Sequence, residues 1–158
     1  MGTRGENMEF EAEARRVVEA LFGAHPGECQ PEHYAEAGPL RELDGLLRLR
    51  DVSHLIMVTT STKLQKVKDD VKKLGIAARL EERSAPAVAM WMITERQLDA
   101  EHVGYARKAN VTCLTLEQLR RRFFDGRDYI LARERTTFGS ARNLRDDSAS
   151  IPAGDNFN

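Results

Sequence analysis

Two apolar segments of strand length, each followed by a charged stretch, set the strongest limits on how this chain folds. The run PAVAMWMIT, residues 86–94, is typical of a central strand that is buried on both faces. The run SHLIMVTT, residues 53–60, opens into a charged segment whose pattern predicts a helix over 62–74 that ends at Gly75. We therefore expect both runs to lie in one sheet that helices cover.

The rest of the pattern predicts the α/β class: a three-layer sandwich with helices flanking a central mixed sheet. A helix is expected over 8–23, and a proline-marked loop separates it from a strand over 41–50. The short connection from that strand to 53–60 favours an antiparallel hairpin, whereas the later strands alternate with helices and favour parallel pairing. The later elements are expected as strands at 76–82 and 111–115 and helices at 99–110, 116–124 and 126–133, with Asp99 as an N-cap.

Length and composition indicate one globular domain. At 158 residues the chain is long enough to bury a core. We expect residues 1–7 outside the fold, as disordered chain or a cloning remnant, a domain over 8–134, and a flexible linker over 135–158 that leads to a missing C-terminal domain. The apolar runs are far shorter than the roughly 20 residues that a membrane span needs. Cys29 and Cys113 lack metal-site spacing, so we expect no zinc site and a cytoplasmic location.

Four hydroxyl side chains follow one another where the strand over 53–60 meets the next helix. They are Thr59, Thr60, Ser61 and Thr62. The simpler interpretation is that one of the last three is the helix N-cap. A functional interpretation adds the binding of a substrate phosphate at the same helix N-terminus. The segment has no glycines, so it is not a Walker A loop, and this argues against a nucleotide kinase or a GTPase.

Carboxylates on the preceding strand suggest a metal site. Glu42 and Asp44 are two residues apart and share one face of their strand, next to Met57 and Thr59 of the neighbouring strand. Mg²⁺ prefers oxygen ligands and keeps several waters, so one or two carboxylates and a substrate phosphate suffice. A glutamate of the first helix, Glu11 or Glu13, adds a further oxygen. The alternative is that Glu42 and Asp44 merely face solvent on an edge strand.

Four segments, in this order, resemble a known family: FEAEARRVVEALFG, GPLRELDGLLRL, LIMVTTSTKLQKVKDDVKKL and MWMITERQLDAEHVGYARKANVTCLTLEQL. They resemble the restriction-endonuclease-like PD-(D/E)xK superfamily, and within it the Mrr-like nuclease domains. That pattern has a Phe-Glu helix start, an aspartate, an E-x-K strand, and a late strand ending in threonine, followed by a helix and a short strand. The resemblance covers about residues 8–124, and it implies a restriction-endonuclease-like fold and metal-dependent cleavage of DNA.

The resemblance also assigns roles by position. Asp44 is similar to the central metal-binding aspartate and Glu11 to the helix glutamate, which implies Mg²⁺ or Mn²⁺ between them. Met57 stands where the glutamate of E-x-K belongs, and Thr59 where the lysine belongs. Related domains often carry threonine there, and another cation then replaces the lysine. The candidates are Lys63, Lys66 and Lys68 of the following helix. A thioether is a poor ligand for Mg²⁺, so we expect weakened metal binding. Whether Met57 is natural or introduced stays open.

The C-terminal segment FDGRDYILARERTTFGSARNLRD resembles the region that joins N-terminal effector domains to NACHT-type STAND NTPases in bacterial defence proteins. This resemblance implies an effector domain whose C-terminal NTPase, absent here, senses a signal and oligomerises. The run RRRFF, residues 120–124, is either a phosphate-contacting patch through Arg120 and Arg121 or the exposed face of a helix.

Two functions remain open from the sequence. The first is a metal-dependent endonuclease that acts on double-stranded DNA in anti-phage defence, with a divergent active site. The alternative is a catalytically inactive nuclease-like domain that serves as a DNA-binding or oligomerisation module, with a homo-oligomer as one form. Dependence on Mg²⁺ or Mn²⁺ separates them, because a binding module tolerates chelator but weakens with salt.

Overall fold

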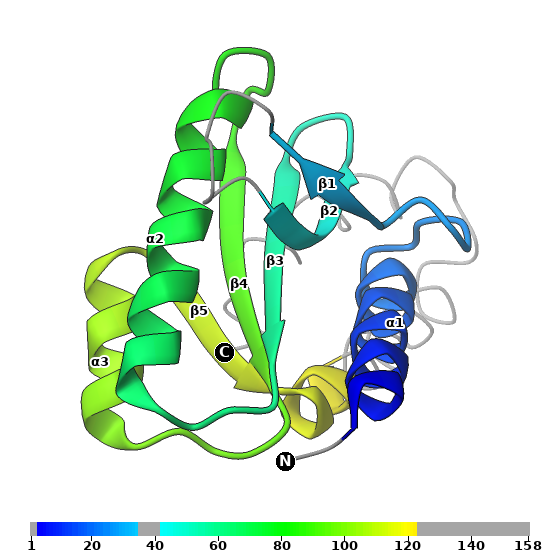
Figure 1. The fold of residues 1–158 in the computed structure, drawn as a ribbon. Helices are drawn as coiled ribbons and strands as arrows, with labels where there is room; N and C mark the ends of the chain where they lie inside the picture. The colour runs from blue at the N-terminus through cyan, green and yellow to red at the C-terminus, as the bar shows by residue number, and fades with distance from the viewer. Residues whose placement is uncertain (1–2, 35–41, 123–158) are drawn as a thin grey trace, which may run out of the picture. The chain divides into compact units, whose positions relative to one another are not determined.

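A computed structural model describes residues 3–34 and 42–122 of the chain. The elements are α1 (Arg4–Leu21), β1 (Gln30–His33), β2 (Glu42–Arg48), β3 (Ser53–Thr59), α2 (Leu64–Glu81), β4 (Val88–Thr94), α3 (Ala100–Lys108) and β5 (Val111–Thr115), and residues 116–122 are helical. The five strands form one sheet in the order β1-β2-β3-β4-β5 (Figure 1). β1, β2 and β3 pair antiparallel, whereas β3, β4 and β5 pair parallel. The predicted mixed sheet is therefore confirmed.

Two apolar clusters, one on each face of the sheet, give the domain its layers. On β3, Leu55 and Met57 pack against α2, whereas Ile56 and Val58 pack on the side of α1. Figure 1 shows α1 on one side of the sheet and α2 and α3 on the other. β3 is buried along its whole length because strands flank both of its edges and helices cover both of its faces. These contacts lie within a compact unit of residues 1–119, and residues 120–158 form a second unit.

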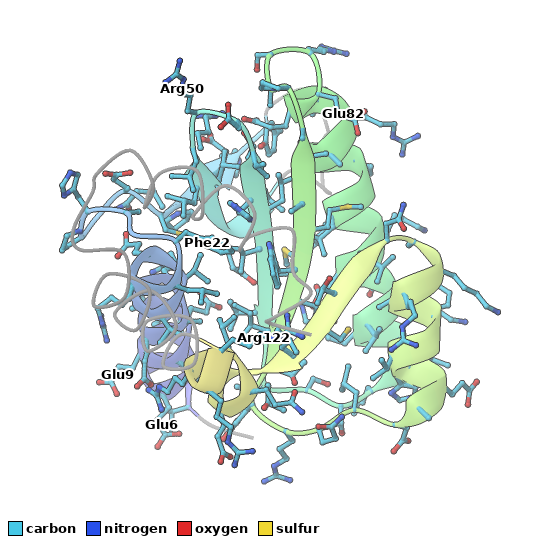
Figure 2. All side chains as sticks on the ribbon, turned by 180° about the vertical axis from the view of Figure 1, so that it is seen from behind. Glu6, Glu9, Phe22, Arg50, Glu82 and Arg122 are labelled. Carbon is cyan, nitrogen blue, oxygen red and sulfur yellow. The ribbon has the colours of Figure 1, made fainter. Side chains whose placement is uncertain are left out.

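The first helix begins earlier than the sequence pattern predicted. α1 starts at Arg4 rather than near residue 8, because Thr3 and Glu6 form a capping box. The Thr3 hydroxyl accepts the Glu6 N–H at 3.2 Å, and the Glu6 carboxylate accepts the Thr3 N–H at 2.7 Å. Glu6 and Glu9 are labelled near this end of α1 in Figure 2. The expectation that all of residues 1–7 lie outside the fold was wrong for residues 4–7.

The helix after β3 runs further than predicted, to Glu81 instead of Gly75. The buried stripe continues beyond the glycine through Ala77, Ala78 and Glu81, so the predicted strand over 76–82 was wrong. Glu81, 3 % exposed, anchors the last turn to the β2–β3 hairpin. Its carboxylate accepts hydrogen bonds from Arg48 at 2.6 and 3.2 Å, from the Tyr34 hydroxyl at 3.1 Å and from the Ser53 hydroxyl at 3.3 Å.

β1 lies inside the segment that was predicted to be a loop. It is a four-residue edge strand and contains Pro31, which sheets accept at an edge. α3 begins at Ala100 with Asp99 at the N-cap position, as predicted, although the Asp99 side chain makes no capping hydrogen bond. The helix predicted over 126–133 and the linker over 135–158 lie outside the described residues. Within the described ranges, no helix is both long and apolar enough to span a membrane.

The α1 face of the sheet contains a buried histidine. The Phe22 ring, at the end of α1 (Figure 2), stacks on the His54 ring with 4.0 Å between their centroids. The Trp91 indole N–H donates to His54 Nδ1 at 3.0 Å, which requires that nitrogen to be unprotonated. Burial lowers the pKa of His54 to about 4. His54 is therefore a neutral core residue that joins α1, β3 and β4.

Candidate active site

A β-bulge places Asp44. β1 pairs with β2 at Gln30↔Leu46 and Glu32↔Leu43, so β2 holds one residue more than β1 between these pairs. In a regular strand, Leu43 and Leu46 would face opposite sides of the sheet because they are three residues apart. The bulge turns both side chains into the same apolar cluster. The register of β2 with β3 ends at Gly45↔Ile56, and the preceding residue of β2, Asp44, bonds to the Val58 N–H through its side chain. The bulge thus sets Asp44 at the end of β3.

The chain fixes Asp44 through both its side chain and its backbone. Asp44 Oδ2 accepts the Val58 N–H at 2.7 Å, beyond the last backbone pair of the β2–β3 ladder. Arg15 of α1 donates from Nη1 to the Asp44 carbonyl at 2.8 Å. Burial raises the pKa of the Asp44 carboxyl, while the Val58 hydrogen bond and the charges of Lys66, Lys73 and Arg15 oppose that rise. A desolvated carboxylate with fixed orientation is suited to binding a cation.

Of the three lysines considered as replacements for the missing strand lysine, the structure brings one to Asp44. Lys66 is partly buried and interacts electrostatically with both Asp44 and Glu11. Lys68 lies over the Tyr105 ring of α3, with Nζ 5.6 Å from the ring centroid. Lys63 is exposed at the N-cap of α2. Of these three lysines, Lys66 is therefore the one that lies near Asp44, and Lys73 of the same helix adds a further positive charge.

Asp70 joins the site, and the sequence analysis missed it. Its Oδ1 accepts from Lys66 Nζ at 2.8 Å, and its side chain is fully buried. Within the described residues, Asp70 Oδ2 has no hydrogen-bond partner. Burial raises the pKa of Asp70, the Lys66 contact opposes this, and Asp44 adds to it. The available signal was a charged residue inside the apolar stripe of α2, between Val67 and Leu74.

Glu11 is the second acidic group that was predicted to hold a metal. Within residues 3–34 and 42–122 its carboxylate makes no hydrogen bond or ion pair, and it interacts electrostatically with Asp44, Arg15 and Lys66. Burial and the nearby Asp44 raise the pKa of Glu11. In the described part of the chain, no three His, Cys, Asp or Glu side chains converge as a metal site. The donors present fit a weak Mg²⁺ or Mn²⁺ site of two carboxylates, completed by water and substrate oxygens.

Met57 and Thr59, at the positions of E-x-K, both lie in the interior. Met57 is 2 % exposed in the core between the sheet and α2, and Thr59 is 4 % exposed. The Thr59 hydroxyl accepts the Ser61 N–H at 3.0 Å, so it stabilises the turn after β3. Neither side chain supplies a carboxylate or an ammonium group, and the contact of β3 with the Asp44 carboxylate is made by the backbone N–H of the neighbouring Val58.

The other three hydroxyl groups do not cap α2. The N-cap is Lys63, which makes no capping hydrogen bond, so the prediction of Thr60, Ser61 or Thr62 was wrong. Ser61 Oγ accepts the Lys63 N–H at 3.2 Å, and the Thr60 hydroxyl pairs with the Asn7 side chain at 3.4 Å. Thr62 is exposed. The hydroxyl run therefore shapes the loop, and phosphate binding by it stays a prediction.

Arg120 and Arg121 belong to the second unit, residues 120–158, and their position relative to Asp44 is not defined. Phe123 and Phe124, which complete the RRRFF run, lie outside the described residues. No protein-family model, curated protein or solved structure matches this chain significantly. On the contacts described above, the candidate site consists of Glu11, Asp44, Lys66 and Asp70.

Proposed function

We propose that this chain is a restriction-endonuclease-like domain of the PD-(D/E)xK type, which hydrolyses phosphodiester bonds of double-stranded DNA with a divergent active site. The observation that carries the proposal is the desolvated Asp44, held at the end of β3 by the Val58 N–H, with Lys66 and Glu11 beside it. This chemistry requires two carboxylates and an ammonium group. Here these side chains come from three different elements.

Each residue has a defined task in this proposal. Asp44 and Glu11 hold Mg²⁺ or Mn²⁺, which supplies polarisation of the scissile phosphate and activation of water when it is bound. Lys66 places positive charge where negative charge develops on the phosphate. The backbone N–H groups at the start of α2 face a substrate phosphate together with the Thr59–Thr62 loop. The domain acts in the bacterial cytoplasm as the effector of an anti-phage protein, whose C-terminal NTPase brings copies together.

The second candidate function is that of a nuclease-like domain without catalysis, which binds DNA or mediates oligomerisation. A specific observation favours it: Met57 is part of the apolar core, where the related enzymes carry a metal-binding carboxylate. Such a module keeps the basic residues of α2 for phosphate contacts and does not need the metal.

The decisive experiment is cleavage of supercoiled plasmid by three proteins: the unchanged chain, Asp44→Asn and Met57→Glu. Asparagine is preferred to alanine because its side-chain oxygen still accepts the Val58 N–H, so that loss of activity is not loss of the fold. Each protein is assayed with Mg²⁺, Mn²⁺ or chelator. Cleavage by the unchanged chain that is lost in Asp44→Asn supports an active enzyme.

Cleavage only after Met57→Glu shows an intact scaffold whose site is disabled by one residue. Cleavage that persists in Asp44→Asn or in chelator rejects the assigned site. If none of the three proteins cuts DNA but the unchanged chain binds it in chelator, the non-catalytic function is correct.

A further inference from the structure

Asp70 is an unusual residue to find in the buried face of a helix. Its carboxylate is fully buried, one oxygen contacts Lys66 Nζ at 2.8 Å, and the other has no partner among the described residues. Burying a carboxylate costs free energy, and an unpaired buried oxygen adds to that cost. A lysine–aspartate pair four residues apart returns little on an exposed helix face, and a buried ion pair often stabilises no more than apolar side chains of similar size. Stability alone therefore does not account for Asp70.

The surroundings of Lys66 indicate what the pair achieves. Acidic groups near its ammonium come from three elements: Glu11 of α1, Asp44 of β2, and Asp69 and Asp70 of α2. Within the described ranges, Asp70 is the one acidic group that Lys66 contacts closer than 4.0 Å. Lys66 thus remains near Asp44 without forming an ion pair with it. A flexible lysine released from Asp70 would be free to pair with Asp44 and occupy the oxygens that a cation needs.

We propose that Asp70 is a positioning residue, which holds the Lys66 ammonium near Asp44 without letting it pair with the Asp44 carboxylate. Lys66 then supplies the positive charge that the lysine of E-x-K, replaced here by Thr59, would supply. The Asp44 oxygens stay available to a metal ion. This inference rests on the proposed function, because it concerns the same site. It gives Asp70 a role that cannot be read from the E-x-K motif, because that motif includes no residue of α2.

The test is Mn²⁺ binding by the full chain, measured by calorimetric titration with the metal alone. The four proteins are the unchanged chain, Lys66→Gln, Asp70→Asn and the double variant. We expect Asp70→Asn to weaken Mn²⁺ binding at least fivefold, because Lys66 then pairs with Asp44. Lys66→Gln should strengthen binding far more in the Asp70→Asn background than in the unchanged chain. Equal gains in the two backgrounds would overturn the proposal.

Asp69→Asn is the matched control. Asp69 sits next to Asp70 and makes the analogous contact one residue earlier, accepting from Gln65 Nε2 at 2.9 Å. Its replacement should leave Mn²⁺ binding within twofold of the unchanged chain. The melting temperature gives a second readout, because a purely structural role predicts a lower value for Asp70→Asn. Positioning predicts an unchanged or higher value, since an unpaired buried carboxylate oxygen is removed.

A readout that does not depend on metal separates this inference from the proposed function. Acetic anhydride labels only unprotonated lysine, so the labelling of Lys66 relative to the exposed Lys72 reports the environment of Lys66. Asp70→Asn should change this ratio at pH 8 at least threefold, and Asp69→Asn should not. If the unchanged chain binds no Mn²⁺, the proposed metal site fails, and labelling alone decides the inference. An unchanged ratio in Asp70→Asn rejects it.

Discussion

The side chain at position 57 lies in the core between the sheet and α2, one residue before Val58, whose N–H binds Asp44. Placing Glu there buries a carboxylate that must either take up a proton or pair with a cation. We expect Met57→Glu to lower the free energy of unfolding by about 2–4 kcal/mol in metal-free buffer. Mn²⁺ should restore a large part of this, as measured by urea unfolding with and without the metal. Met57→Leu is the control, with a cost below about 1.5 kcal/mol and no response to Mn²⁺.

Two glycines of this chain should respond to alanine in opposite directions. A Cβ on Gly45 would lie 3.0 Å from Cys29 Sγ and 3.3 Å from Arg15 Cγ, so Gly45→Ala must displace groups that fix the bulge. We expect it to lower the free energy of unfolding by about 1–3 kcal/mol. A Cβ on Gly75, inside α2, would meet nothing within 4 Å. Gly75→Ala should raise the free energy of unfolding by roughly 0.5–1 kcal/mol. Denaturant unfolding of both variants tests the pair, and a stabilised Gly45→Ala would contradict it.

At the scale of elements, the extent of α2 and the loop before it were the hardest features to predict. Gly75 looked like a helix end because glycine is enriched there, but the buried stripe continues through Ala78 to Glu81, and packing outweighs a cost of about 1 kcal/mol. Thr60, Ser61 and Thr62 looked like N-caps, yet Ser61 accepts the Lys63 N–H within the loop and Thr60 bonds to Asn7 of α1. Packing against distant segments decides where α2 ends, and the hydrogen bonds of the preceding loop leave Lys63 at its N-cap.

The contact between α1, β3 and β4 through His54 makes stability depend on pH. The unfolded chain binds a proton at His54 near the ordinary pKa of about 6.5, whereas the folded chain resists it down to about pH 4. The contribution of His54 to the free energy of unfolding is therefore fully present above pH 6.5, and it is lost as the pH falls towards 4. We expect a loss of at most about 3 kcal/mol.

The variant His54→Asn isolates this effect, because asparagine does not titrate and its oxygen can accept the Trp91 N–H. Its stability should fall less than that of the unchanged chain between pH 7 and pH 4.5, by denaturant unfolding. The comparison cancels the opposite contribution of Glu11, Asp44 and Asp70, whose raised pKa values make the fold gain stability as they protonate. Parallel pH profiles for the two proteins would refute the assignment.

For the whole molecule, the layer order and the mixed sheet were predictable because strand-length apolar runs and amphipathic helices follow from residue patterns. Met90 and Met92 face one helix layer while Trp91 faces the other, as strand alternation requires. The candidate site was predictable only in part. Asp44, Glu11 and Lys66 were named from the sequence, whereas the bulge that aims Asp44 and the burial of Asp70 arise from contacts between distant segments.

The two apolar clusters predict how much of the chain is needed to fold. Their buried members lie between Ala14 and Leu119, so a fragment of residues 1–122 contains all of them. We expect this fragment to unfold in one cooperative transition, with a melting temperature within a few degrees of that of the full chain. Circular dichroism on both proteins provides the measurement. A fragment that melts far lower would show that residues 123–158 contribute to the core.

The buried Cys29 beneath the bulge has a practical consequence for following this protein in solution. Burial raises the pKa of Cys29 to about 12 and that of Cys113 to about 11, so neither thiol reacts readily with labelling reagents at neutral pH. The chain has two cysteines in total. A fluorophore attached at Lys63→Cys, on the exposed start of α2, would therefore be a single-site reporter. Its signal would test the proposed binding of DNA beside Asp44 without removal of the native thiols.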